Sequence, residues 1–413
     1  MKILITGAQF GNKGAQSLLF TVMDQLRRQD ADTEIYYTPV DNYKSYAPDH
    51  PFRFHLIFGG RDAHRYETHP ELREEMLANQ AERRKQEPTA LAPEVLSGLH
   101  RLLPQLDGVL DVSGYALTSK MADFANRRLL WHIAEAARYG IPVILLPQSF
   151  GPFHYAGESA DLPERIRETL PLAARIYARE PEGYQLLTEE FGLSNVRQAP
   201  DLVLQTEPPD WRNLMTREPD LRVPRLETTG NVGVIPNTQT FLHGDERAIL
   251  SLYRELLAEL IRRGRQIWIF RHSEDLEPCK AIAALFPDHP QVHLVEEEFS
   301  CFGYSAFVRQ FDYIIASRFH AVVHAYREGI PAVIPGWAVK YRELAALLGQ
   351  EAYAFDITER FDPRDLLRAV ERMDERFREE RDSIAAGISR LRKHNCFPQC
   401  WEILERAKKE RRC

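Results

Sequence analysis

The sequence predicts an α/β protein with two Rossmann-like domains, each a doubly wound parallel sheet, that face each other across a cleft. Short apolar runs of strand length alternate with segments whose apolar residues recur at helical spacing, as in a parallel sheet covered by helices. This alternation starts at the first residues and restarts after about residue 229. The chain has 413 residues, a length that favours two domains over one.

The first predicted domain covers residues 1–206. It opens with the strand-like run KILIT, which a segment with helical periodicity follows. Later strand-like runs lie in GVLDVSG and IPVILLPQS, with a helical pattern between them. Residues at about 60–104 are charged and irregular, and we expect them to form a solvated helical insertion in this domain.

The second predicted domain covers residues 231–413. Residues 207–230, which precede it, are rich in proline and charge without clear periodicity, and this indicates a linker. Strand-like runs such as NVGVIPN and QIWIFRH again alternate with helical patterns. The helical pattern after Pro363 is assigned to this domain, with packing back across the first domain as the alternative.

The composition limits the classes of function. The chain has 60 acidic and 53 basic side chains and a formal net charge of -7, which argues against a general nucleic-acid-binding protein. No apolar stretch approaches the ~20 residues of a membrane-spanning helix, so we expect at most peripheral membrane association. The five cysteines lack paired metal-binding spacings, and the first apolar run is too short for a signal peptide. We therefore expect a protein of the cytoplasm or of the inner face of the membrane, without a metal site; Cys396 and Cys400 receive no role.

The loop after the first strand is the first candidate ligand site. Its glycines Gly7, Gly11 and Gly14 allow an anion to approach the start of the next helix closely. The spacing is not the G-x-G-x-x-G pattern, which disfavours a dinucleotide-binding oxidoreductase. Two interpretations remain for Asn12: contact with a substrate, or a tight turn in which this residue adopts a positive φ angle.

Polar residues also follow the other strand-like runs. Ligands of open α/β sheets bind at the carboxyl ends of the strands, so these residues are expected to line the cleft. Each of them, taken alone, also suits a turn or a helix cap. The candidates are Ser113, Gln148, Arg179 and Asp201 in the first half and Asn237, Arg271 and His272 in the second.

The segment Ser317-Arg318-Phe319-His320 begins a helical pattern directly after an apolar strand. Ser317 suits the N-cap, Arg318 the first helical position and His320 the first turn. A cation at a helix start opposes the helix dipole, so Arg318 requires a negative partner, either a ligand or a nearby carboxylate. His324 shares the helix face with His320, but no metal-binding motif includes it, and we interpret it as structural.

Eight short motifs are spread over most of the chain, from Gly7 to Lys340: GNKGAQ, LDVSGY, LLPQSFGPF, YARE, APDLVL, VIPN, ASRFHAVVHAYREGIPAV and VKY. Together they resemble the polysaccharide pyruvyltransferase family. Its members resemble GT-B glycosyltransferases in fold and transfer the carbon skeleton of phosphoenolpyruvate to a sugar as a cyclic ketal. The resemblance implies release of phosphate and no redox cofactor or required metal. The sequence departs from the family where Gly14-Ala15-Gln16 replaces an acidic segment and where Glu180 replaces an aspartate after Arg179.

The resemblance also implies roles for individual residues. Arg318 fits the donor-binding arginine, and Arg179 would hold phosphoenolpyruvate from the facing domain. His320 would act as the general acid that protonates the donor. Lys340 and Asn237 are further candidates for substrate binding.

The expected acceptor is a sugar of a cell-surface polysaccharide or of its precursor, carried on a lipid or a nucleotide. Two alternatives stay open: a nucleotide-sugar glycosyltransferase of the GT-B type, and a non-catalytic glycan-binding protein. The sequence leaves the acceptor sugar, its linkage and any homo-oligomer undetermined.

Overall fold

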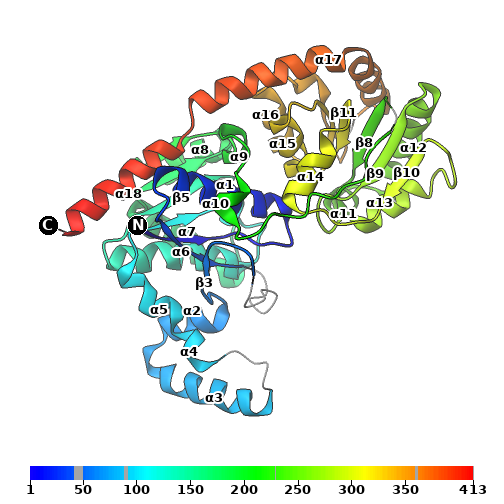
Figure 1. The fold of residues 1–413 in the computed structure, drawn as a ribbon. Coiled ribbons are helices and arrows are strands. Elements are labelled where there is room, and N and C mark those ends of the chain that lie inside the picture. The colour runs from blue at the N-terminus through cyan, green and yellow to red at the C-terminus, as the bar shows by residue number, and fades with distance from the viewer. Residues whose placement is uncertain (41–49, 88–91, 228, 359–360, 413) are drawn as a thin grey trace.

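The computed structural model describes residues 1–40, 50–87, 92–227, 229–358 and 361–412. Within these residues the chain forms two β-sheets, each covered by helices (Figure 1). The first sheet has seven described strands in the order β3-β2-β1-β4-β5-β6-β7, and the second has six in the order β10-β9-β8-β11-β12-β13. Neighbouring strands of both sheets pair in parallel, which confirms the predicted α/β class.

The first sheet is made of short apolar strands, and β5 is buried along its whole length, as expected for a parallel sheet between helices. Its strands are β1 (Lys2–Thr6), β2 (Glu34–Thr38), β3 (His55–Leu56), β4 (Gly108–Asp111), β5 (Val143–Gln148), β6 (Arg175–Ala178) and β7 (Val196–Gln198). The helices that accompany it are α1 (Lys13–Gln29), α6 (Asp123–Arg138), α7 (Leu162–Thr169), α8 (Pro181–Gln185), α9 (Leu202–Gln205) and α10 (Trp211–Leu214).

The second sheet repeats this design, and its strands β8, β11 and β12 are fully buried. Its strands are β8 (Asn231–Ile235), β9 (Gln266–Phe270), β10 (Val292–Val295), β11 (Tyr313–Ala316), β12 (Ala332–Gly336) and β13 (Ala354–Asp356). Its helices are α11 (Thr238–His243), α12 (Glu246–Arg262), α13 (Leu276–Ala283), α14 (Cys301–Val308), α15 (Phe319–Arg327), α16 (Val339–Ala346) and α17 (Pro363–Lys393).

The strand order of each sheet reverses next to its first strand, between β1 and β4 in one sheet and between β8 and β11 in the other. Ligands of open α/β sheets bind at the carboxyl edge beside such a reversal. The loops that lead into α1 and α15 begin at these two reversals, since α1 follows β1 and α15 follows β11. The topology therefore directs attention to the starts of these two helices.

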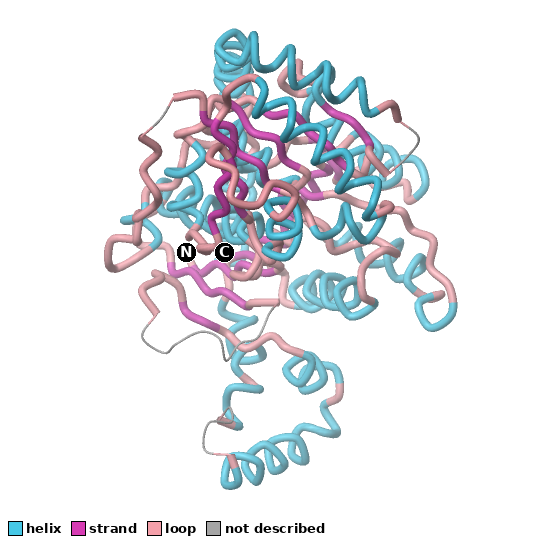
Figure 2. The backbone as a smooth tube through the Cα atoms, turned by 90° about the vertical axis from the view of Figure 1, so that its right-hand side faces the viewer, coloured by secondary structure: helices cyan, strands magenta, loops and turns pink. Residues whose placement is uncertain are grey.

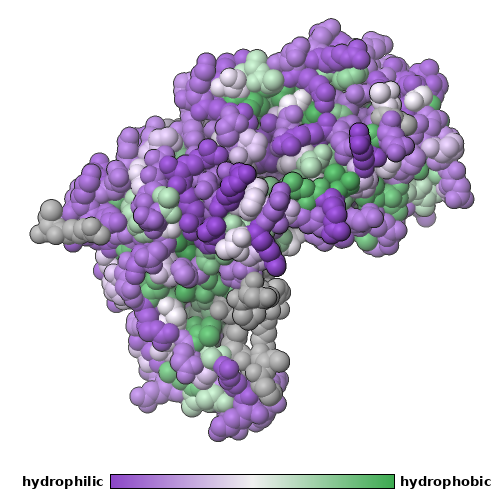
Figure 3. All heavy atoms as spheres, in the orientation of Figure 1, coloured by the Kyte–Doolittle hydropathy of each residue, from purple (hydrophilic) through white to green (hydrophobic). Residues whose placement is uncertain are grey.

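A helical segment projects from the first domain away from the second (Figure 1). It contains α2 (Arg61–Thr68), α3 (Arg73–Gln86), α4 (Pro93–Leu96) and α5 (Gly98–Leu102). These helices occupy the residues for which the sequence predicts a solvated insertion. No residue of α3 is buried, and hydrophilic residues cover much of this face of the molecule (Figure 3).

The last helix, α18 (Phe397–Arg412), returns to the first domain, although the sequence assigns residues 231–413 to the second. A Cβ atom placed on Gly108 of β4 would lie 2.2 Å from the Leu404 side chain, so α18 packs directly on the first sheet. The Tyr177 hydroxyl of β6 also donates a hydrogen bond to Gln399 (3.3 Å). The two chain termini consequently lie on the same domain (Figures 1 and 2).

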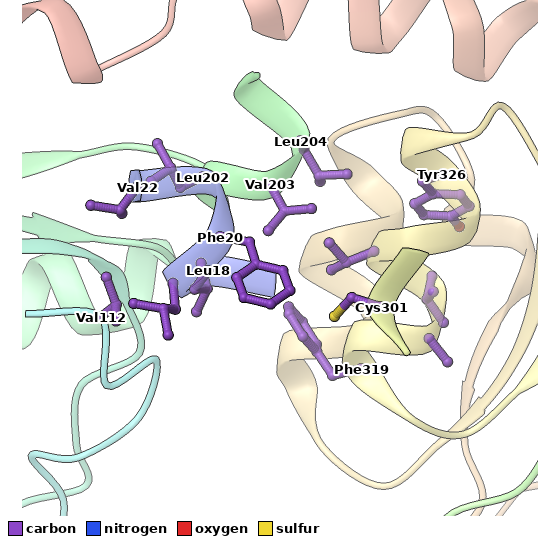
Figure 4. Packing of buried hydrophobic residues seen from close by; sticks show 14 of the residues in the cluster. Leu18, Phe20, Val22, Val112, Leu202, Val203, Leu204, Cys301, Phe319 and Tyr326 are labelled. Atoms are coloured by element: carbon purple, nitrogen blue, oxygen red, sulfur yellow. The ribbon is translucent and has the colours of Figure 1, made fainter. Parts of the chain in front are cut away.

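An apolar interface joins the two domains. Figure 4 shows side chains from α1 and α9 on one side and from α14 and α15 on the other. The rings of Phe20 and Phe302 stack across it with centroids 5.7 Å apart. This packing holds the carboxyl edges of the two sheets against each other. Among the described residues, no helix is long and apolar enough to cross a membrane.

Candidate functional site

The start of α1 reaches into the second domain. Asn12 is its N-cap and accepts hydrogen bonds from the backbone N–H groups of Gly14 (2.9 Å) and Ala15 (3.3 Å). The φ angle of Asn12 is -107°. The interpretation of Asn12 as a turn residue with a positive φ angle is therefore wrong. The Lys13 ammonium donates to Glu298 (2.8 Å), and the Lys13 backbone N–H donates to the hydroxyl of a serine after β9 (3.1 Å).

Gly14 lies against the ring of His320 from the other domain. A Cβ atom at this position would stand 2.3 Å from both Cγ and Nδ1 of the imidazole. Only a glycine lets α1 approach the first turn of α15 so closely. The interface therefore fixes one face of the His320 ring.

His320 also faces a carboxylate across the domain boundary. Its Nε2 atom lies 3.5 Å from Oδ2 of Asp201, an ion-pair distance at which the two groups do not form a well-aligned hydrogen bond. Burial lowers the pKa of His320, while the Asp201 carboxylate opposes that effect. Burial alone would raise the pKa of Asp201, but His320 and Arg179 hold it below its ordinary value. Asp201 thus offsets part of the effect of burial on the pKa of His320.

Arg179 is buried, and each of its three guanidinium nitrogens has an oxygen partner. Its three nitrogens donate to Glu180 (2.7 Å), Asp201 (2.9 Å) and Ser149 (2.6 Å). Its guanidinium also lies 4.3 Å from the ring centroid of Phe319 in the second domain. Burial opposes the charged form, but the two carboxylates raise the pKa of Arg179 overall. In this conformation Arg179 positions Asp201, and its expected contact with a donor stays a prediction.

Arg318 has carboxylate partners within its own domain. It is the N-cap of α15, so the helix begins at Phe319, one residue later than the sequence suggests. Its guanidinium donates to Asp275 (3.0 Å) and Glu274 (3.1 Å), both in the loop after β9. The sequence left two kinds of partner open for Arg318, a ligand or a nearby carboxylate. The structure shows nearby carboxylates in this role.

Asn237 and His272 are two further residues of the predicted site, and both make contacts within the second domain. Asn237 caps α11 by accepting from the Gln239 N–H (2.9 Å) and donates to the carbonyl of Ser317 (3.0 Å). His272 has no exposed surface, and its Nε2 lies 3.4 Å from Nδ1 of His324. Burial lowers the pKa of both histidines well below the ordinary range, so both rings are neutral. Their placement agrees with the structural role expected for His324.

Arg271, Ser113 and Gln148 also make internal contacts. Arg271 lies 3.5 Å from Glu298, the carboxylate that Lys13 binds. The Ser113 hydroxyl (2.9 Å) and the Gln148 amide (3.1 Å) both donate to Asp111 at the end of β4. The Oε1 atom of Gln148 is buried and has no hydrogen-bond partner within the described part of the chain. All three residues lie at or shortly after the carboxyl end of a strand, as their positions in the sequence predict.

Lys340 is a cation of this region that has no acidic partner among the described residues. Its Nζ lies close to four aromatic rings, with centroid distances of 4.8 Å to Trp337, 5.5 Å to Tyr115, 5.8 Å to Phe319 and 5.9 Å to Tyr341. Tyr115 belongs to the first domain, so this aromatic cage closes across the boundary. No hydrogen bond or ion pair of Lys340 occurs within the described ranges. Burial lowers the pKa of Lys340 to about 8, with a smaller effect of nearby arginines, so the group is mainly charged at neutral pH.

Glu343 is a site residue that the sequence analysis missed. It follows Lys340 by three residues on α16 and therefore shares its helix face. Burial, followed by the charges of Glu180 and Glu182 from the first domain, raises the pKa of Glu343 to about 7. The only signal in the sequence was its spacing from Lys340, because a glutamate in an amphipathic helix is otherwise ordinary.

The assembled site thus combines one uncompensated ammonium, a guanidinium, a histidine paired with a carboxylate, and a carboxyl group that titrates near neutrality. Within the described residues, no group of three or more His, Cys, Asp or Glu side chains is arranged to hold a metal ion. An ammonium, a guanidinium and a helix start suit a small ligand with more than one negative charge. A histidine and a carboxyl group with shifted pKa values suit proton transfer.

Solved structures of low sequence identity share the fold. UDP-GlcNAc 2-epimerase from Methanocaldococcus jannaschii is 13% identical with a TM-score of 0.52, and the match covers 90% of this chain and 92% of that one. Trehalose 6-phosphate synthase from Burkholderia multivorans is 10% identical with a TM-score of 0.53 and 99% of each chain covered. UDP-GlcNAc 2-epimerase from Neisseria meningitidis, bound to UDP-GlcNAc, is 11% identical with a TM-score of 0.53 and covers 93% of this chain and 94% of its own. These likenesses confirm the GT-B type of fold.

The family is shown by a sequence comparison. No curated protein sequence matches the chain significantly. The family model described as polysaccharide pyruvyl transferase matches residues 12–336, from the N-cap of α1 to the end of β12. The match contains Arg179, Asp201 and the start of α15, while Lys340 follows four residues beyond it. The chain belongs to the polysaccharide pyruvyl transferase family.

Proposed function

We propose that the protein transfers the pyruvyl unit of phosphoenolpyruvate to a sugar of a cell-surface polysaccharide or its precursor, with formation of a cyclic ketal and release of phosphate. Membership of the family supports a transferase that acts on polysaccharide. The observation that supports an anionic donor is the environment of Lys340. This cation lies among four aromatic rings and has no acidic partner in the described chain. Removing a charge from water is unfavourable unless a counter-charge arrives, and an anionic donor supplies one.

Donor binding would join Lys340 to the start of α15. Phosphoenolpyruvate carries a phosphate and a carboxylate, which a lysine, an arginine and helix N–H groups bind well. Arg318 would turn toward the donor by giving up Glu274, a surface carboxylate whose side chain is 65% exposed. Its second partner, Asp275, is completely buried and would keep the guanidinium oriented. This exchange explains how an arginine that already has partners can still bind a ligand.

His320 would supply the proton that starts the reaction. Protonation of the methylene carbon of phosphoenolpyruvate leaves a cationic carbon at C2, which one sugar hydroxyl attacks. The second hydroxyl then attacks C2 and phosphate leaves, so that C2 carries both sugar oxygens. One hydroxyl proton replaces the proton that His320 donated, and the other leaves with phosphate. The protons of the reaction therefore balance. The bound anion and Asp201, 3.5 Å away, would both raise the pKa of His320 and load it with a proton.

Phosphate release tests this proposal. The protein is incubated with phosphoenolpyruvate and a panel of sugar diols, free and carrier-linked, and both phosphate and pyruvylated product are measured. We expect phosphate only when both substrates are present, and one ketal for each phosphate. Release of a nucleoside diphosphate from a nucleotide sugar, without phosphate from phosphoenolpyruvate, would instead identify a glycosyltransferase. Binding of phosphoenolpyruvate without turnover on any acceptor would support the glycan-binding alternative.

A further inference from the structure

Arg128 on α6 is a buried cation of the first domain that has no hydrogen-bond or ion-pair partner among the described residues. Its side chain is 9% exposed. Lys340 of the donor region is partly exposed, and the other buried lysine and arginine residues of the described chain each have an acidic or hydroxyl partner, as Lys13 has Glu298 and Arg327 has Ser305. Within the same residues, Arg128 has no hydrogen bond and no ion pair, only a ring contact. A guanidinium stays charged in proteins, so this charge is uncompensated.

Two histidines share the surroundings of Arg128. Its Cζ lies 5.9 Å from the ring centroid of Phe124, and the ring of His64 from α2 lies 6.2 Å from the same centroid. His132 follows Arg128 by one turn of α6, and both histidine rings contact Trp131, at 5.1 Å and 5.0 Å. The Nδ1 atom of His64 and the Nε2 atom of His132 are buried and have no hydrogen-bond partner in the described structure. We refer to Arg128, His64 and His132 as the Arg128 cluster.

The charges around this cluster favour an anion. Burial lowers the pKa of both histidines, and the charge of Arg128 lowers them further, so both rings are neutral and each can donate one N–H. The carboxylate that acts on Arg128 is Asp111, which is not within ion-pair distance and accepts hydrogen bonds from Thr6, Ser113 and Gln148 instead. The cluster thus combines one positive charge with two neutral donors, and no described acidic side chain pairs with it.

The position of the cluster in the fold also points to a ligand. Arg128 is within electrostatic reach of Asp111 at the end of β4 and of Tyr37 near the end of β2. Strand β1 lies between these two strands, and the sheet order reverses between β1 and β4. This is the edge at which open α/β sheets bind ligands. The donor cations Lys340 and Arg318 belong to the other domain.

We infer that the Arg128 cluster binds a phosphate-type anion on the first domain, and that this anion belongs to the acceptor or to its carrier. A guanidinium holds two phosphate oxygens at once, and the imidazole N–H groups add donors at the sides. The anion would also relieve the unfavourable burial of a lone charge. The identification of the ligand as the acceptor rests on the proposed function, whereas the anion site itself does not.

Calorimetric titration with inorganic pyrophosphate, with and without phosphoenolpyruvate, tests the site without any turnover. We expect Arg128→Met to weaken pyrophosphate binding at least tenfold, which corresponds to the loss of a charge-assisted hydrogen bond of ~1.5 kcal/mol or more. The affinity for phosphoenolpyruvate should stay unchanged. The matched control is Arg138→Met on the same helix, because Arg138 is exposed and pairs with Glu135. Its pyrophosphate affinity should equal that of the wild type.

Thermal unfolding distinguishes a ligand site from a structural role. Without ligand, Arg128→Met should unfold at or above the wild-type Tm, because an uncompensated buried charge is gone, and pyrophosphate should no longer raise it. A lower Tm with undiminished pyrophosphate binding would overturn the inference, as would weakened binding of phosphoenolpyruvate. Stronger binding of pyrophosphate than of inorganic phosphate supports a diphosphate-linked acceptor, and equal binding supports a monophosphate. Failure of phosphate release from phosphoenolpyruvate would refute the proposed function and leave this titration unaffected.

Discussion

Replacement of Lys340 by methionine should make the protein more stable and less able to bind its donor. The ammonium lies among four aromatic rings without an acidic partner in the described chain, and burial lowers its pKa from 10.5 to about 8. A lysine with a lowered pKa binds its proton less tightly in the folded state. It therefore disfavours folding below about pH 8, and this effect fades as the pH rises from about 8 to 10.5.

The magnitude of each effect follows from the structure. The lowered pKa corresponds to at most about 3 kcal/mol that disfavours folding at neutral pH. Lys340→Met should thus raise the Tm by a few degrees, and the gain should shrink above pH 8. Loss of a charge-assisted hydrogen bond of about 1.5 to 3 kcal/mol should weaken phosphoenolpyruvate binding about ten- to a hundredfold.

Differential scanning fluorimetry and calorimetric titration measure the two effects on the same protein. Lys85→Met is the matched control, because Lys85 is exposed on the inserted helix α3 and pairs with Glu82. We expect this control to change neither the Tm nor the donor affinity. Wild-type donor affinity in folded Lys340→Met would refute the assignment of Lys340. A Tm well below that of the wild type would show that the Lys340 ammonium stabilises the fold, contrary to the effect expected from its lowered pKa.

Three further predictions concern neighbouring groups. His320→Gln should still bind phosphoenolpyruvate and lose turnover about 100-fold, because it cannot carry the proton; near wild-type turnover in a single-turnover assay would place the acid elsewhere. Gly14→Ala should lower kcat more than donor affinity, because its Cβ would lie 2.3 Å from the His320 ring; unchanged kcat would show that the domains need not close this tightly. Glu343→Gln should leave the Tm unchanged below the ordinary glutamate pKa of 4.5 and raise it above pH 7, because between these two values the carboxyl ionises more readily in the unfolded than in the folded protein; equal shifts in the two pH ranges would contradict the raised pKa.

The sequence predicted where several residues of the candidate site lie, because parallel sheets place the residues that follow their strands at one edge. Arg179, Asp201, Arg318 and His320 all follow apolar strands, and the structure brings His320 and Asp201 within 3.5 Å of each other. The periodicity of short apolar runs was sufficient for the two doubly wound sheets. This prediction is possible because the local sequence shows which residues form a strand and which residues follow its carboxyl end.

Contacts between distant segments could not be predicted in this way. The partners of Arg318 come from the loop after β9, and nothing in a single sequence pairs a guanidinium with Glu274 and Asp275. The docking of α18 on the first domain depends on which apolar face lies nearest, which helical spacing does not reveal. Glu343 became recognisable only when the domain interface placed Glu180 and Glu182 near it.

The proposed transfer is tested most directly in one reaction that contains phosphoenolpyruvate and a sugar diol, in which phosphate and pyruvylated glycan are measured together. We expect acceptor-dependent phosphate release, with one pyruvate ketal formed for each phosphate. Folded protein that binds phosphoenolpyruvate and releases no phosphate with any acceptor would contradict it.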